Sequence, residues 1–166
     1  GSEMCIRDSV KIACLAQLVN VIAPIMTSDT GAWRQTIFYP YMHASTMGRG
    51  TVLNTAVKVD SYESSHGDAP YIDSVVIKDE ANETLTVFAV NKDLENPYEV
   101  TMDVRQFAGY SVKEHILLTH ADVKAINTEQ DPDQVAPVRV DTDTIDAGTL
   151  TMRFPAKSWN VIRLAK

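Results

Sequence analysis

The hydrophobic period of this 166-residue chain changes near residue 50, and the change limits the folds that the chain can adopt. Residues 10–20 are apolar on almost every side, which is typical of a helix buried on most of its surface. Residues 21–27 are a short run rich in Ile and Val, which favours a strand covered on both faces, as in a parallel sheet. Residues 36–47 carry an apolar stripe and predict a second helix, which ends at the glycine-rich residues 48–50.

From residue 51 onward the period is two, which indicates an all-β region. Residues 98–104 alternate cleanly, so their even-numbered side chains, from Tyr98 to Val104, share one face of a strand. A polar turn at residues 79–83 predicts a hairpin, and residues 124–147 are predicted to be mostly loop. The predicted strands are 74–78, 84–91, 98–104, 111–119, 149–154 and 158–164. The pattern predicts a mainly β fold, either a β-sandwich or a jelly roll, preceded by a helix-strand-helix segment.

The charge balance excludes some classes of partner. A net charge of -7 and a pI near 5.0 argue against nucleic acid, because phosphates select surfaces rich in Lys and Arg. The apolar run at residues 10–26 is interrupted by Lys11, Gln17 and Pro24, and a membrane span needs about 20 mostly apolar residues. We therefore expect neither a nucleic acid nor a membrane partner. Cys14 lies among apolar neighbours, which predicts a buried thiol, and the two cysteines indicate no disulfide framework or metal motif.

The titratable residues form no evident catalytic or metal-binding motif. Carboxylates gather in predicted turns and loops, at residues 79–80, 129–133 and 141–146, where such side chains start turns. The four histidines lack the spacing of a zinc motif, and His43 is expected to pack at the end of the second helix. Residues 64–68 contain Ser, His and Asp, but adjacency in sequence does not give the geometry of a triad. We therefore expect no catalytic residue and no metal ligand within this chain.

Trp33 and Gln35 are the candidate substrate-binding residues. They are predicted to lie in the loop between the apolar strand and the second helix, and strand-to-helix loops build the active sites of (β/α) barrels. An indole offers a platform for the C–H face of a sugar, and a carboxamide both donates and accepts hydrogen bonds. The alternative is structural, with Trp33 anchoring the loop and Gln35 capping the helix. Arg34, between them, is expected to point elsewhere and to pair with a carboxylate.

Several segments resemble the α-L-arabinofuranosidases of glycoside hydrolase family fifty-one. The segments are residues 11–25, the block Trp33-Arg34-Gln35-Thr36-Ile37-Phe38-Tyr39-Pro40, residues 43–45, residues 87–91 and residues 158–164. These enzymes have a (β/α)8 barrel followed by a jelly-roll β-sandwich. They remove terminal arabinofuranose from arabinan, arabinoxylan and oligosaccharides with retention of configuration. The resemblance implies that Gln35 contacts the bound sugar, and Trp33 matches the tryptophan of the same motif.

The resemblance also implies a division of the chain. Residues 10–50 would be the last helix-strand-helix elements of the barrel, and residues 51–166 the C-terminal sandwich. Residues 1–9 look foreign, as a tag or leader does. The family's two catalytic glutamates lie on earlier barrel strands, and Glu3 is no substitute, so the chain is expected to be a fragment that is inactive alone. The implied reaction needs no cofactor or metal, and the implied setting is a cytoplasmic enzyme that assembles as a homo-oligomer.

Two non-catalytic alternatives remain open for the β region. A carbohydrate-binding accessory module would show an exposed row of aromatic side chains, for which the candidates are Tyr62, Tyr71, Tyr98 and Tyr110. A structural module that caps the barrel and mediates assembly would instead show an apolar surface patch.

Overall fold

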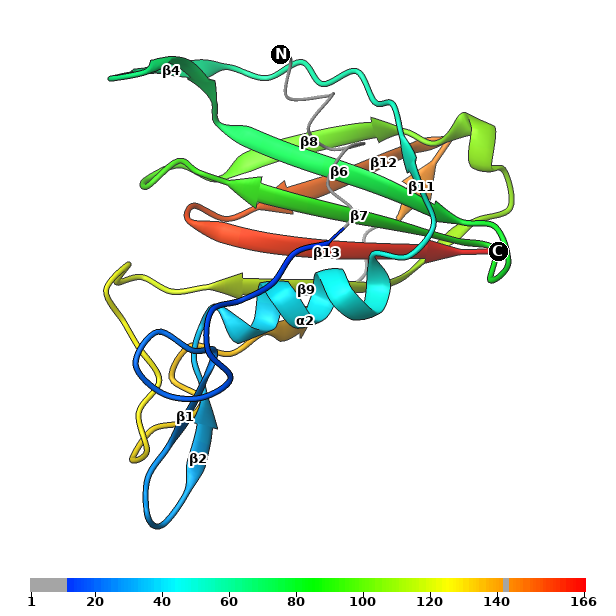
Figure 1. Ribbon diagram of the computed structural model, residues 1–166. Helices are drawn as coiled ribbons and strands as arrows, with labels where there is room; N and C mark the ends of the chain where they lie inside the picture. The colour runs from blue at the N-terminus through cyan, green and yellow to red at the C-terminus, as the bar shows by residue number, and fades with distance from the viewer. Residues whose placement is uncertain (1–11, 142–143) are drawn as a thin grey trace.

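A six-stranded antiparallel sheet forms the middle layer of the molecule in the computed structural model, which describes residues 12–141 and 144–166 (Figure 1). Its strand order is β10-β9-β13-β7-β6-β3. These strands are β3 (Thr51–Leu53), β6 (Ile72–Asp79), β7 (Thr84–Asn91), β9 (Ser111–Thr119), β10 (Val138–Val140) and β13 (Ser158–Ala165). The central strand β13 pairs with β7 and with β9, so that Val161 lies opposite both Phe88 and Ile116.

A three-stranded sheet covers one face of this middle layer. It has the order β11-β12-β8 and consists of β8 (Tyr98–Asp103), β11 (Ile145–Asp146) and β12 (Thr149–Phe154). The short 3-10 helix η1 (Arg105–Phe107) follows β8. The shared core includes Leu85, Val87 and Ile162 from the large sheet and Leu150 and Met152 from the small one. The mainly β fold is thus confirmed, with two sheets packed face to face.

Helix α2 (Phe38–Met47) covers the opposite face of the middle layer (Figure 1). Met47 packs against Phe88 and Val161, which alternate along their strands with the residues of the first core. The buried His43 accepts a hydrogen bond at Nδ1 from the indole of Trp159, at 3.1 Å, which fastens the helix to β13. Burial lowers the pKa of His43, against a smaller opposing effect of Glu114, so the neutral ring that this bond requires is favoured.

The second predicted helix and six predicted strands are present. Strands β7, β9 and β12 have the predicted bounds, and β6, β8 and β13 differ by a few residues. The chain leaves α2 through Gly50, whose φ of +134° suits glycine, and a Cβ there would lie 2.2 Å from the carbonyl oxygen of Lys78. Two short hairpins were not predicted: β1 (Ile25–Thr27) with β2 (Ala32–Arg34), and β4 (Ser61–Ser64) with β5 (Gly67–Pro70).

The predicted first helix is wrong for the residues that the structure describes. Residues 12–20 form bends and irregular chain, and Gln17 and Asn20 have φ of +62°, which no continuous right-handed helix allows. A helix of this length is marginal in water unless neighbours cover its apolar sides. Here those sides have little cover, and Ile12 and Leu18 are 82% and 79% exposed. Residues 1–11, which include the expected leader, lie outside the described residues.

Two further expectations for the N-terminal region are corrected. The expected parallel strand at residues 21–27 is reduced to β1, which pairs antiparallel with β2, so Trp33 lies in a strand instead of a loop. The side chain of Asn20 stabilises this arrangement by bonding Thr27 twice, through Nδ2 to Oγ1 at 2.8 Å and through Oδ1 to the backbone N–H at 2.7 Å. Cys14 is exposed rather than buried.

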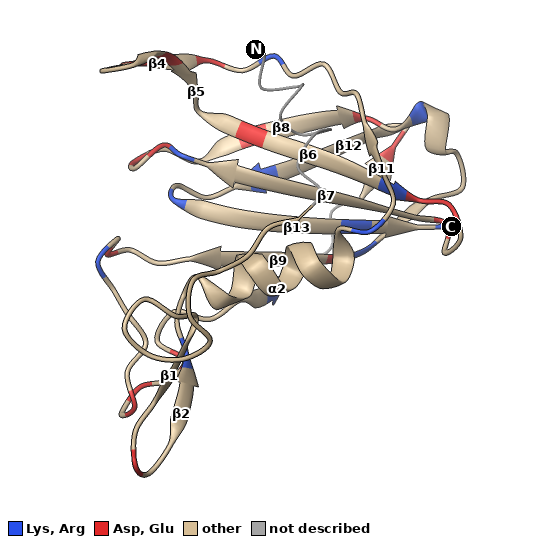
Figure 2. Cartoon of the chain, viewed as in Figure 1, with Lys and Arg blue, Asp and Glu red and all other residues tan. Residues whose placement is uncertain are grey.

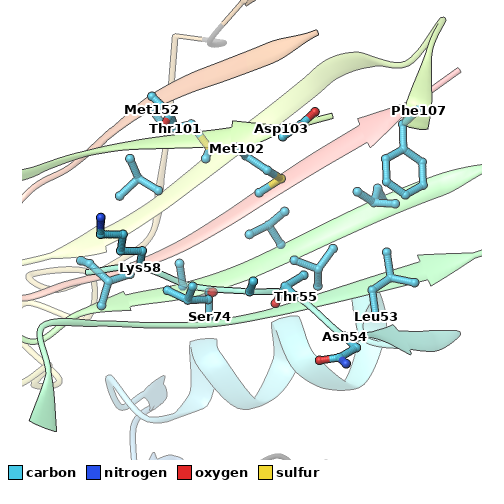
Figure 3. Close-up of a pocket in the computed structure, with 18 of the residues that line it drawn as sticks. Leu53, Asn54, Thr55, Lys58, Ser74, Thr101, Met102, Asp103, Phe107 and Met152 are labelled. Atoms are coloured by element: carbon cyan, nitrogen blue, oxygen red, sulfur yellow. The ribbon is translucent and has the colours of Figure 1, made fainter. Parts of the chain in front are cut away.

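A cavity of about 940 Å³ lies between the two sheets (Figure 3). Methionine side chains at residues 102 and 152 and the segment of residues 54–58 contribute to its lining. Neither Trp33 nor Gln35 lines it, so the cavity is separate from the predicted sugar contacts. Over the described residues, no helix has the length and apolar character that a membrane crossing requires.

The alternating burial of β12 gives a direct test of the sandwich core. Leu150 is 0% exposed and Thr151, the next residue, points outward. We expect Leu150→Ala to lower the free energy of unfolding by about 2–5 kcal/mol, because it leaves a cavity between the sheets. Thr151→Ala, the matched control, should cost less than about 1 kcal/mol. Urea unfolding of both variants measures the difference, and equal costs would contradict the observed face assignment.

Candidate functional site

The β1–β2 hairpin holds the Trp-Arg-Gln segment next to helix α2. Met26 of β1 lies opposite Trp33 of β2, and the backbone N–H of Gln35 donates to the carbonyl of Pro24 at 2.8 Å. The carbonyl of Gln35 then accepts from the backbone N–H of Phe38, at 2.9 Å, where the helix begins. Trp33 and Gln35 are two residues apart on an extended chain, so their side chains leave from the same face.

Both candidate side chains bind one backbone oxygen. The indole N–H of Trp33 and the carboxamide N–H of Gln35 donate to the carbonyl of Asn127, at 3.0 and 2.8 Å. Asn127 lies in the long loop between β9 and β10, and 1% of its surface is exposed. Trp33 and Gln35 are themselves half-buried. Both residues therefore have a structural contact. Trp33 anchors its segment, as the structural alternative expected, whereas the Gln35 side chain bonds the loop and does not cap α2.

The side chain of Asn127 is fully engaged. Its Nδ2 donates to the carbonyls of Arg34 and Val135, at 2.9 and 3.0 Å, and its Oδ1 accepts from the N–H of Val135, at 2.7 Å. The residue therefore bonds the main chain of β2 and the return of its own loop. Sequence reasoning missed Asn127, because a single amide in a polar loop has no periodic or spacing signal.

Arg34 occupies the opposite face from its two neighbours, as expected, but its predicted ion pair is not formed with any described carboxylate. Its guanidinium lies 5.3 Å from the ring centroid of Phe38, in a cation–π contact. Burial and then Asp133 raise the pKa of the neighbouring Tyr39, against the lowering influence of Arg34. The arrangement fixes the start of α2.

The tip of the hairpin is fastened to the same long loop. Glu129 Oε1 accepts hydrogen bonds from the hydroxyls of Ser28, at 2.7 Å, and of Thr30. The Ser28 hydroxyl oxygen also accepts from the N–H of Gly31, at 3.0 Å. The bonds from Thr30 and then Ser28 lower the pKa of Glu129, because they stabilise its ionised form. One loop thus holds the hairpin at two points, through Asn127 and through Glu129.

One known protein family matches most of this chain. The family described as the alpha-L-arabinofuranosidase C-terminal domain matches residues 7–158. The chain belongs to this family.

Curated relatives and solved structures agree with this assignment. Two enzymes named intracellular exo-alpha-(1→5)-L-arabinofuranosidase, from Halalkalibacterium halodurans and Bacillus subtilis, are 52% and 50% identical over 161 residues, which are 96% of this chain. The chain spans only 32% of the length of each. A family 51 alpha-L-arabinofuranosidase from Bifidobacterium longum superimposes with a TM-score of 0.81 at 38% identity, covering 89% of this chain and 29% of that one. The thermostable GH51 enzyme from Thermotoga petrophila gives 0.83 at 25% identity, over 96% and 35%.

The other residues considered as catalytic candidates in this arabinofuranosidase domain make structural hydrogen bonds. Residues 64–68 form the tip of the β4–β5 hairpin, where the Ser64 hydroxyl donates to the Gly67 carbonyl at 2.6 Å instead of to a histidine. His115 is buried within β9 and bonds Asn160 Oδ1 at 3.1 Å. Among the described residues, no group of three or more His, Cys, Asp or Glu side chains is placed to hold a metal ion.

Three of the four candidate tyrosines do form a row. The rings of Tyr62 and Tyr71 lie 5.0 Å apart and those of Tyr71 and Tyr98 lie 5.5 Å apart, whereas Tyr110 packs on Phe107 elsewhere. The three rings of the row are half-buried, and Tyr71 stacks on Tyr98 and is tilted against Tyr62. Their stacked faces are used within the protein, so the row pins the β4–β5 hairpin to the sandwich instead of forming the exposed platform that an accessory binding module predicts.

The contact of Glu129 with the hairpin predicts a pH dependence. Its folded pKa is lowered, so the stabilisation is complete above 4.5, the ordinary value for glutamate, and is lost as the pH falls through the lower folded value. We expect the difference in unfolding free energy between the wild type and Glu129→Gln to be constant near neutral pH and to shrink as the pH falls below 4.5. Urea unfolding from pH 7 to pH 3 measures it. In a Ser28→Ala, Thr30→Val background the pH dependence should disappear, and its persistence there would contradict the assignment.

Proposed function

We propose that this chain is the C-terminal part of a retaining, exo-acting α-L-arabinofuranosidase, in which Gln35 and Trp33 contact the terminal arabinofuranosyl group. The observation that carries the proposal is the family match over residues 7–158, together with three curated relatives that are named intracellular exo-alpha-(1→5)-L-arabinofuranosidase. The substrates would be arabinan, arabinoxylan and related oligosaccharides, as the family resemblance implies. No cofactor is required for this chemistry.

The reaction divides the work between this chain and the rest of the enzyme. Retaining hydrolysis needs a nucleophilic carboxylate and an acid/base carboxyl about 5–5.5 Å apart, and the resemblance assigns both to earlier barrel strands. The part played by this chain is binding and orientation. The Gln35 carboxamide gives one N–H to Asn127 and keeps its oxygen and second N–H for sugar hydroxyls. The Trp33 indole N–H is likewise bonded to Asn127, which leaves its ring face for the proposed contact with the sugar.

An uncharged apolar surface supports a large contact with the remainder of the polypeptide. Residues 12–28 and helix α2 contain no Lys, Arg, Asp or Glu (Figure 2). Several of their large apolar side chains are exposed, including Val21 at 80% and Ile22 at 62%. The two segments lie together, since the Tyr41 hydroxyl donates to the carbonyl of Ala13 at 2.8 Å. Exposed apolar patches of this kind mark interfaces, and we assign this one to the end of the barrel, at residues 10–50.

The setting of the enzyme follows from the same comparison. Relatives named as intracellular support a cytoplasmic location for the whole protein. A homo-oligomer of the full-length enzyme, as is common in the resembled family, completes the proposal.

Hydrolysis of p-nitrophenyl-α-L-arabinofuranoside tests the division of work. We expect no p-nitrophenol release by this 166-residue chain and release by the same chain extended upstream through a complete barrel. The physical reason is that both reacting carboxyls lie in the added part. Activity of the short chain that survives repurification would contradict the proposal, as would inactivity of a folded extended protein.

The role of Gln35 is tested by substitution in the extended enzyme. Gln35→Ala should lower kcat/KM by about ten-fold or more, since one or two hydrogen bonds to sugar hydroxyls, each about 0.5–1.5 kcal/mol, are lost. Gln134→Ala, the same change at an exposed position of the neighbouring loop, is the matched control and should leave kcat/KM unchanged. Equal values for the two variants would remove Gln35 from the substrate site.

A further inference from the structure

We propose that Asn127 is a positioning residue of the arabinofuranose site, which orients the carboxamide of Gln35 so that its oxygen faces the sugar. The inference rests on the proposed function, because it concerns how the sugar contact is built. It adds a residue from the β-sandwich, 92 positions further along the chain, to a site otherwise formed by the Trp-Arg-Gln segment.

The orientation of Gln35 follows from the chemistry of its partner. A backbone carbonyl has no proton to give, so only the NH2 side of the Gln35 carboxamide can face the Asn127 oxygen at 2.8 Å. The Oε1 atom must then point away from the loop, and among the described residues no donor is bonded to it. Gln35 is therefore presented as an acceptor for a sugar hydroxyl, with one N–H to spare as a donor.

The Asn127 carbonyl can impose this orientation because it is itself fixed. The Asn127 side chain donates to the carbonyls of Arg34 and Val135 and accepts from the N–H of Val135. A buried side chain must here both donate and accept, which asparagine does and aspartate does not. The Asn127 side chain thus fixes its own backbone carbonyl relative to the backbone of Arg34. Arg34 lies between Trp33 and Gln35, the two residues whose side chains donate to that carbonyl.

The same carbonyl couples the two candidate sugar contacts. Trp33 and Gln35 share it as acceptor, so a shift of the loop moves an indole ring and a carboxamide together. Loss of the Asn127 side chain should therefore weaken sugar binding although Asn127 itself need not touch the sugar.

Steady-state kinetics of variants in the extended enzyme test the role of Asn127. Asn127→Ala should raise KM for p-nitrophenyl-α-L-arabinofuranoside by about ten-fold with little change in kcat, because the loss is in the placement of a binding group. The control is Leu118→Ala, which opens the same apolar cluster of Tyr39 and Val135 without removing any hydrogen bond of Asn127. It should lower thermal stability and leave KM within two-fold of the wild type.

A double-mutant cycle separates positioning from mere stability. If Asn127 acts through Gln35 and Trp33, then Asn127→Ala should raise KM clearly less in a Gln35→Ala background than in the wild type, because only the Trp33 contact remains to be displaced. Additive effects in the cycle, or equal KM values for Asn127→Ala and Leu118→Ala, would overturn the inference. Asn127→Ser, which keeps one donor and acceptor, serves in place of Asn127→Ala if that variant does not fold, and the same criteria then apply to it.

The experiment also distinguishes this inference from the function on which it rests. A folded wild-type extended enzyme that releases no p-nitrophenol contradicts the proposed function itself. If the extended enzyme is active and Gln35→Ala raises KM but Asn127→Ala leaves KM unchanged, only the positioning role of Asn127 is contradicted.

Discussion

The burial of both faces of one antiparallel sheet is the constraint on which the rest of this structure depends. Strand β13 is paired on each edge, and its successive side chains enter different cores: Ile162 packs toward the small sheet, and Val161 packs toward α2. A strand buried on both sides tolerates no shift of register, because a slip by one residue would exchange the two cores. The bond between Trp159 of this strand and His43 then sets the position of α2 along the sheet.

The candidate site is built from this sheet outward. Helix α2 continues directly from the Trp-Arg-Gln segment, so fixing the helix fixes one side of the site. The other side is the loop that leaves β9, the strand paired with β13 on its second edge. Val135 of this loop packs with Tyr39 of α2, which closes the loop against the helix and brings Asn127 to the hairpin. The site is thus a meeting of two chain segments more than 90 residues apart, and the sheet determines where they meet.

The parts of this structure that could be predicted are those in which local pattern and burial agree. Residues 84–91 and 149–154 were predictable because their apolar positions match faces that are buried in the fold. The pattern failed at residues 12–20, where an apolar run lacks the neighbours that would make a helix stable, and at the polar β4–β5 hairpin, whose pairing is not encoded in an alternating pattern. Trp33 and Gln35 were predicted as substrate contacts from their motif, and that role stays a prediction. Asn127 was not predicted, because its importance arises from a long-range contact that leaves no local mark.

The two interpretations of Trp33 and Gln35, as anchors and as sugar contacts, are compatible because each side chain has more than one interacting group. The indole donates its only N–H to Asn127, and its ring face stays available for a ligand. The carboxamide donates one N–H to Asn127, and its oxygen stays available. A binding group that is already held in one orientation loses less conformational entropy when a ligand arrives. Anchoring to a buried residue of the sandwich is therefore a means of preorganising the site. Under the proposed function, it would also give the C-terminal domain a part in substrate recognition, although the reacting carboxyls are expected to lie on other strands.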